Sequence, residues 1–221
     1  MRAALLIFLF YMAAPHPALA GAWLRGEGET FLSVTGTLRE TASDVGLETD
    51  IYLEHGLGPR LTAGLVFNDN GVDSGHALAF LRLPLGRMEG ASRYSLELGL
   101  GAHHFFDTWR PMQKVTLAYG RGLSWEGGSG WLSLDAAVEH RQGLPDPDYK
   151  LDLTLGQSGG AKLRPMLKLG TTYAPGLPLG WTASAHVLFD GPKDVTWSLG
   201  IERKRAGPLS TALVVGVWRR F

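Results

Sequence analysis

The chain has 221 residues, and its 21 lysine and arginine side chains balance its 21 aspartate and glutamate side chains. This length suits a single domain, and the balanced charge argues against a protein dedicated to binding nucleic acid. Because the chain contains no cysteine, the sequence excludes disulfides, thiolate zinc sites, a thiol nucleophile and the lipid-bearing cysteine of a lipoprotein.

The N-terminus has the features of a secretory signal. Arg2 supplies a minimal positive region, residues 3–14 form an apolar stretch, and a small-residue site ends at Ala20. The apolar stretch is followed by two prolines and is too short for a membrane anchor. We therefore predict cleavage after Ala20, with residues 1–20 as the signal peptide and residues 21–221 as the mature domain.

From Thr30 onward, apolar side chains alternate with polar or small ones, and this period of two predicts strands with one apolar and one polar face. Such segments suggest about twelve strands, an even number as in bacterial single-chain barrels. Residues 76–83 are apolar at both alternating positions, so ten strands is the alternative. The connections are short and rich in turn-forming residues. The predicted strands are residues 30–39, 46–55, 60–68, 76–83, 93–105, 113–121, 130–141, 149–156, 162–173, 181–190, 194–203 and 210–221.

The positions of the aromatic residues separate a membrane barrel from a soluble sandwich. A sandwich core holds aromatic side chains near mid-strand, whereas a membrane barrel holds them in two girdles at its interfaces with water. Here they lie at strand ends on the apolar face, and a periplasmic N-terminus sorts them into two rings. The sequence therefore predicts an all-β fold, a closed antiparallel transmembrane β-barrel with short loops. The predicted girdle residues are Phe67, Tyr94, Tyr119, Tyr149, Tyr173, Trp181, Phe189 and Phe221.

The C-terminal strand carries the most specific resemblance. Residues 213–221 place apolar side chains at alternate positions and end on Phe221, although Arg219 interrupts the apolar face. This ending resembles the terminal signal of the bacterial outer-membrane β-barrel superfamily, and residues 51–64 resemble a hairpin of its small transporter- or porin-like members. The resemblance implies an outer-membrane location in a Gram-negative bacterium and contact with outer-membrane lipid and lipopolysaccharide. It also implies recognition of Phe221 by the barrel-assembly machinery.

The polar face of the predicted strands supplies the candidate functional residues. Its charges nearly balance, and they must be hydrated or paired, because an unpaired charge in an apolar interior is very costly. A barrel of this size is intermediate between barrels filled by side chains and barrels with a wide channel, and its short loops offer no plug. We expect a narrow passive pore or small-solute transporter, with a structural barrel closed by its own charges as the alternative. The predicted lumen-lining residues are Glu48, Asp50, Glu97, Lys114, Asp135, Glu139, Arg141, Asp152, Arg164, Lys168 and Glu202; Glu54, Lys150 and Arg220 share their parity.

A lipid-modifying outer-membrane enzyme is the remaining alternative. A serine or threonine nucleophile needs a base within hydrogen-bond reach and a third group that orients the base. His103 and His104 lie near Asp107, and His140 and His186 lie on other strands, but no serine stands at a recognisable spacing from them. Neighbouring strand residues such as His103 and His104 face opposite sides and cannot hold one metal ion together. We therefore expect no enzymatic activity, no cofactor and no metal.

Overall fold

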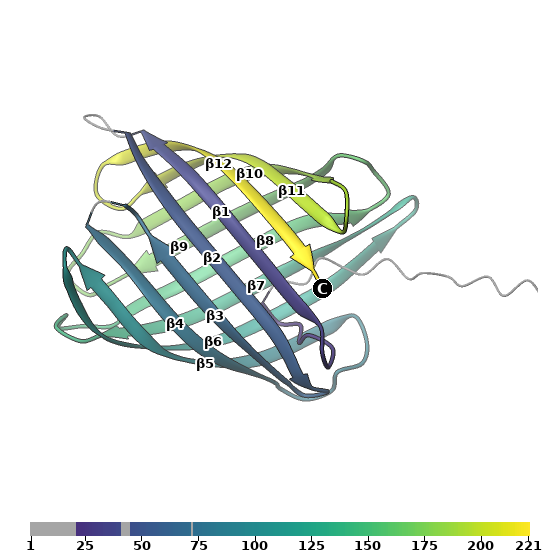
Figure 1. The fold of residues 1–221 in the computed structure, drawn as a ribbon, viewed down its shortest axis with the longest axis horizontal. Helices are drawn as coiled ribbons and strands as arrows, with labels where there is room; N and C mark the ends of the chain where they lie inside the picture. The colour runs from purple at the N-terminus through teal and green to yellow at the C-terminus, as the bar shows by residue number, and fades with distance from the viewer. Residues whose placement is uncertain (1–20, 41–44, 72) are drawn as a thin grey trace, which may run out of the picture.

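The computed structural model describes residues 21–40, 45–71 and 73–221, so the predicted signal peptide lies outside the described residues. The described chain forms twelve antiparallel strands that wrap round a common axis (Figure 1). They are β1 (Thr30–Glu40), β2 (Val45–Gly58), β3 (Leu61–Asp69), β4 (Ser74–Pro84), β5 (Ser92–Phe105), β6 (Thr108–Trp125), β7 (Gly128–Arg141), β8 (Asp148–Gly159), β9 (Arg164–Tyr173), β10 (Gly180–Asp190), β11 (Val195–Arg205) and β12 (Leu209–Arg220).

Consecutive strands pair with each other, and β1 closes the circle because it pairs with both β2 and β12. The prediction of an all-β, closed antiparallel barrel of about twelve strands is confirmed, and the ten-strand alternative is wrong. No helix in the described part of the chain is long and apolar enough to cross a membrane.

Strand β4 left the strand number open because it is apolar on both faces, and the structure explains why. Leu78 and Phe80 point inward and are buried, whereas Leu81 points outward and is exposed. The Phe80 ring stacks on the ring of Tyr52 from β2, with 5.8 Å between the ring centroids. The inward face of β4 is therefore apolar at Leu78 and Phe80 and charged only at Arg82, near its end.

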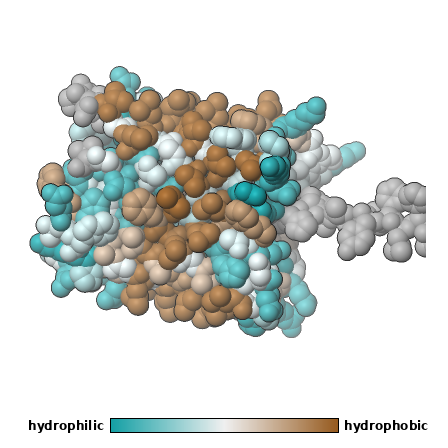
Figure 2. Space-filling view, in the orientation of Figure 1, coloured by the Kyte–Doolittle hydropathy of each residue, from teal (hydrophilic) through white to brown (hydrophobic). Residues whose placement is uncertain are grey.

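The outer surface of the barrel carries an apolar belt (Figure 2). Leu100, Leu155 and Ile201 come from three different strands, and they are 68%, 42% and 65% exposed. Such a belt is far larger than the apolar patches that soluble monomers expose. The exterior therefore suits the hydrocarbon of a bilayer, in which closed barrels leave no backbone group unpaired.

Six of the predicted girdle residues are exposed near strand ends, whereas Trp181 is partly buried and Tyr119 is partly buried and lies six residues before the end of β6. Tyr94 and Tyr119 are neighbours at one end, with 5.0 Å between ring centroids, and Tyr149 and Tyr173 are neighbours at the other, with 6.3 Å. Trp197, which was not among the predicted girdle residues, pairs in register with Phe189 and is also exposed.

Strand β1 begins, and strand β12 ends, at the same end of the barrel. We call it the periplasmic end, following the orientation predicted from the sequence. At the opposite, extracellular end, β6 begins at Thr108 rather than at the predicted residue 113, and only two residues separate it from β5. Residues 108–112 do not alternate regularly between apolar and polar side chains. The period of two is therefore weak there, and the predicted strand was too short.

Candidate functional site in the barrel lumen

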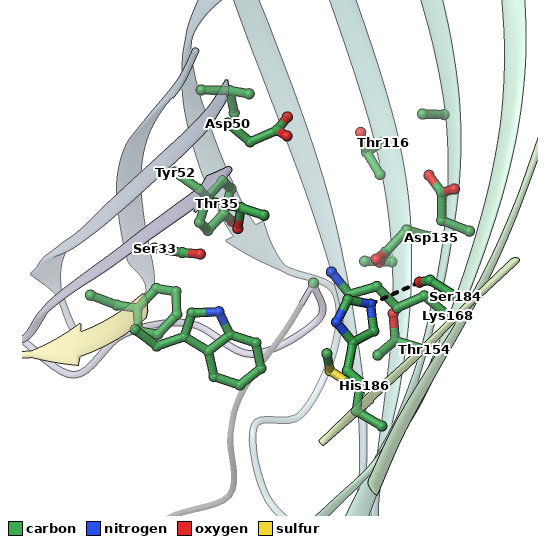
Figure 3. Close-up of a pocket in the computed structure, with 18 of the residues that line it drawn as sticks. Ser33, Thr35, Asp50, Tyr52, Thr116, Asp135, Thr154, Lys168, Ser184 and His186 are labelled. Atoms are coloured by element: carbon green, nitrogen blue, oxygen red, sulfur yellow. Dashed lines mark hydrogen bonds between the residues drawn. The ribbon is translucent and has the colours of Figure 1, made fainter. Parts of the chain in front are cut away.

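A cavity of about 470 Å³ occupies the middle of the lumen, and its walls come from strands all round the barrel (Figure 3). Its lining includes the neighbouring rings of Phe31, Tyr52 and Trp218, with 6.4 Å between the Phe31 centroid and each of the other two. The wall also carries polar groups such as Ser184 and His186. Of the predicted lumen-lining residues, those that line this cavity are Asp50, Glu97, Lys114, Asp135, Asp152, Lys168 and Glu202.

On the extracellular side of the lumen, Glu139 of β7 lies among several cationic side chains. Its carboxylate lies 2.9 Å from Lys150 Nζ, 2.8 Å from Arg141 Nη2 and 3.8 Å from Lys114 Nζ. These partners come from β7 itself and from its two neighbours, β6 and β8. The cluster therefore runs along the wall and leaves the centre of the lumen open.

A second wall cluster surrounds Arg39 of β1. Its guanidinium donates to Glu48 of β2 at 2.5 and 3.0 Å, and to Glu202 of β11 at 2.5 Å. It also donates to Ser210 of β12 at 3.1 Å. These pairs join four adjacent strands across the seam where the barrel closes. Glu48 and Glu202 therefore act as parts of the wall as well as facing the lumen.

The periplasmic half holds a third cluster, and all its charged members are buried. Glu54 accepts from Arg25 at 2.5 Å, from the Tyr52 hydroxyl at 2.5 Å and from Arg82. Arg82 also donates to Glu97 at 2.6 Å. Arg25 belongs to the residues that precede β1, and no pattern in the sequence predicted a role for it.

Four charged residues in the middle of the lumen make no ion pair with the described residues: Asp50, Asp135, Asp152 and Lys168. Asp50 accepts from Asn68 at 2.6 Å, and Asp135 faces Asp152 in register on the neighbouring strand. Asp152 and Lys168 project inward and nevertheless keep exposed surface. Water therefore reaches them, as it must if charges without counter-ions are to stay ionised.

Arg164 lies away from the central cavity. It makes a two-pronged ion pair with Asp190 at the periplasmic rim, with distances of 2.6 and 2.5 Å. There it lines a separate hollow that also includes Leu188 and Arg220. Glu139 and Arg141 face inward in their wall cluster but are not among the residues that line the cavity.

The histidines do not form a complete catalytic set among the described residues. His186 hydrogen-bonds to Ser184 Oγ at 2.9 Å and to Ser198 Oγ at 3.1 Å, and no carboxylate orients its ring. His103 bonds to a backbone carbonyl, whereas His104 bonds to Asp69 at 3.2 Å. No group of three or more potential metal ligands was found in the described part of the chain. A serine–histidine pair without an orienting group lacks part of what nucleophilic catalysis needs.

No family model matches this chain, and no curated protein matches it in sequence. Solved structures do match it in fold. The NanC porin is 11% identical with a TM-score of 0.59, and the match covers 84% of this chain and 98% of the porin. The KdgM porin in complex with disordered oligogalacturonate is 11% identical with a TM-score of 0.58, over 86% of this chain and 99% of the porin.

The COG4313 outer-membrane channel from Pseudomonas putida F1 is 16% identical with a TM-score of 0.57, over 93% of this chain and 99% of the channel. By fold, this chain is a closed β-barrel of the kind that these porins and outer-membrane channels form. Its exposed apolar belt and aromatic strand ends suit insertion into a lipid bilayer. The matched proteins are porins and channels rather than enzymes.

Sequence reasoning missed the contribution of residues 21–29, which we call the N-terminal segment. They lack the period of two and precede the first predicted strand, and no role was predicted for them. A signal was present, because Ala22, Trp23 and Leu24 are apolar and Arg25 follows them at once, which is an unusual composition for an exposed linker.

Proposed function

We propose that this barrel is an outer-membrane channel for small polar solutes. The observation that carries the proposal is the hydrated cavity in the middle of the lumen, lined by charges that the barrel does not use to hold itself together. A volume of about 470 Å³ lies within the range of pockets that hold small organic ligands. The fold is also shared with porins and channels.

The arrangement of the ion pairs argues against the alternative, a barrel packed shut by its own charges. The clusters around Glu139, Arg39 and Glu54 link strands that are next to each other or two apart in the barrel. None of these pairs among the described residues spans the lumen from one wall to the opposite one. The charges therefore brace the wall and leave space at the centre.

The unpaired charges give the channel a preference for cations. Three carboxylates, Asp50, Asp135 and Asp152, face the cavity together with the unpaired Lys168. Charges that line a narrow pore select ions of opposite sign. The excess of carboxylates is small, and ion pairs balance most other charges in the lumen, so the preference is weak.

The channel proposal is tested with the mature chain, residues 21–221, refolded into planar bilayers. We expect discrete single-channel current steps, and we expect liposomes that contain the protein to swell in small sugars and amino acids before larger ones. Correct folding is checked separately by the shift that an intact barrel shows on a gel before and after heating. Folded protein that gives no current steps, together with no current from the variants described below, would remove the channel proposal.

For assembly, we propose that Phe221 is recognised by the barrel-assembly machinery and that lipid and lipopolysaccharide surround the barrel. Phe221 is exposed at the periplasmic end, and the guanidinium of Arg219 lies 4.5 Å from the centre of its ring. Arg219, which interrupts the apolar pattern, thus covers an aromatic ring at the interface, where a long cationic side chain can reach water. Deleting Phe221 should lower the amount of folded barrel in the outer membrane, while Phe105→Ala at the opposite end should not.

A further inference from the structure

The N-terminal segment enters the periplasmic half of the lumen and is buried there. Ala22, Trp23 and Arg25 are only 1%, 9% and 4% exposed. Ala22 and Trp23 form an apolar cluster with inward-facing side chains from five strands, namely Ala118, Trp131, Met166, Leu188 and Trp218. A segment that was merely a linker would lie in solvent and would make no such cluster.

Polar contacts hold the same segment against the wall. The backbone N–H of Arg25 donates to Thr62 Oγ1 at 2.9 Å, and the Arg25 guanidinium donates to Glu54 at 2.5 Å. Gly28 donates to the carbonyl of Gly56 at 2.9 Å, and Gly56 donates back to the carbonyl of Glu29 at 2.9 Å. The segment therefore has both an apolar and a hydrogen-bonded anchor.

Two glycines in the barrel wall leave the space that the N-terminal segment occupies. A Cβ on Gly120 of β6 would lie 2.6 Å from the Trp23 ring and 2.9 Å from Ala22 Cβ, both too close for a real side chain. A Cβ on Gly56 of β2 would collide with the backbone of Gly26. Neither glycine has a positive φ that would demand glycine for its backbone conformation. The need for glycine at both positions therefore comes from the segment itself.

The segment also lies between two hollow parts of the lumen. Gly21 lines the central cavity, and Glu29 lines the hollow at the periplasmic rim. Phe31 and Trp218 line both hollows and so form the boundary between them. The Trp23 cluster lies at this boundary, because its member Met166 lines the cavity and its member Leu188 lines the rim hollow.

We propose that the N-terminal segment is the constriction of the pore and that Trp23 is the residue that sets its bore. This inference rests on the channel function proposed above and names the part of the chain that limits permeation. Removing the segment does not leave Glu54 without a partner, because Arg82 and Tyr52 still donate to it. The barrel can therefore tolerate changes in the segment without a buried, unpaired carboxylate.

The first test is Trp23→Ala in the mature chain. Removing the indole from the constriction should raise single-channel conductance about two-fold or more and should admit larger solutes in liposome swelling, because pore diameter limits permeation. The matched control is Trp109→Ala, which changes an exposed tryptophan in the extracellular hairpin and should leave conductance unchanged. If the wild type conducts and Trp23→Ala conducts equally, the constriction lies elsewhere and the inference is overturned.

The second test uses the absence of native cysteines. Trp23→Cys should conduct more than the wild type, and a bulky methanethiosulfonate reagent should then lower its current. Leu144→Cys, an exposed extracellular position, should react without changing the current. A reagent that modifies the thiol of the Trp23→Cys variant but leaves its current intact would contradict the inference.

The two proposals fail in different ways. If neither the wild type nor any folded Trp23 variant conducts, the channel proposal is wrong. If the wild type is silent and Trp23→Ala conducts, both proposals are supported and the segment closes the pore at rest. If Trp23→Ala does not fold, Trp23→Leu provides a smaller apolar side chain with the same expected direction.

Discussion

The Glu139 and Glu54 clusters, at opposite ends of the lumen, differ in how far their cations reach water. On the extracellular side, Lys114, Arg141 and Lys150 surround Glu139 with 22–25% of their side-chain surfaces exposed. On the periplasmic side, Arg25 and Arg82 surround Glu54 with only 4% exposed. The first cluster lines a wet passage, whereas the second is sealed beneath the N-terminal segment and its aromatic neighbours.

This difference shows how one barrel can be both open and narrow. Wall clusters that stay in contact with water need little burial and leave the bore free. A buried cluster, by contrast, is stable only if every member keeps a partner, because a lone charge out of water is strongly unfavourable. The Glu54 cluster should therefore be more sensitive to single substitutions than the Glu139 cluster, whose cations reach water.

The largest expected effect is the loss of stability in Glu54→Gln compared with Glu139→Gln. Glu54→Gln removes the carboxylate that two buried guanidinium groups share, which should lower the free energy of unfolding by about 3 to 5 kcal/mol. Glu139 is itself only 2% exposed, but the cations around it can turn toward lumen water, so Glu139→Gln should cost less than Glu54→Gln, about 1 to 3 kcal/mol. Urea unfolding in lipid vesicles measures both. Equal losses would show that the two halves are not different in the way described.

A smaller effect is expected when the wall is altered instead of the segment. Gly120→Val should push Trp23 away from β6 and further into the lumen, lowering stability by about 1 to 3 kcal/mol, as overpacking does, and lowering conductance. Gly122 lies two residues further along the same strand, and the nearest atom to a Cβ there would be 3.9 Å away. Gly122→Val is therefore the control, and it should leave conductance close to that of the wild type.

Charge selectivity should respond to the middle of the lumen, between the two halves. Asp152→Asn should weaken the preference for cations, and Lys168→Met should strengthen it, because each removes one unpaired charge from the cavity wall. Reversal potentials across a salt gradient report both changes. The shifts should shrink in concentrated salt, in which the screening length falls to about 3 Å at 1 M. Shifts of the same sign in both variants would rule out this account of selectivity.

The smallest expected effect is that of His186→Ala. The imidazole holds Ser184 and Ser198 by hydrogen bonds, and losing these should cost about 1 kcal/mol of stability. Conductance should change little, because His186 belongs neither to the three charge clusters nor to the N-terminal segment. A lipid-hydrolysing activity in the wild type that His186→Ala abolishes would instead identify an enzyme.

The sequence predicted the barrel well because a lipid-facing strand has to alternate along its whole length. Alternation of Leu96, Leu98 and Leu100 with Glu97 and Gly99 is enough to assign both faces of β5. The same alternation predicted which charged side chains face inward. The structure was needed only to show which of them form ion pairs. Which charges pair depends on register and on neighbours across the barrel seam, such as Arg39 with Glu202, and no local pattern contains that information.

The N-terminal segment could not be placed in the same way. Its position depends on contacts with residues far along the chain, such as Thr62 and Gly120, and a segment without regular structure has no period to reveal its faces. The prediction that short loops leave the lumen without a plug was therefore incomplete. The loops are short, but the residues before the first strand enter the lumen instead.

Gly21 stands at the inner tip of the N-terminal segment, where a Cβ would lie 2.8 Å from Asp135 Oδ2. If the leader is removed after Ala20, the cut creates a free α-ammonium group at this point, next to a carboxylate that no described side chain neutralises. The precursor would carry an uncharged peptide bond in the same place. Cleavage of the leader would then place a fixed positive charge inside the pore, beside Asp135. One proteolytic step would thus accompany secretion and also change the electrostatics of the lumen.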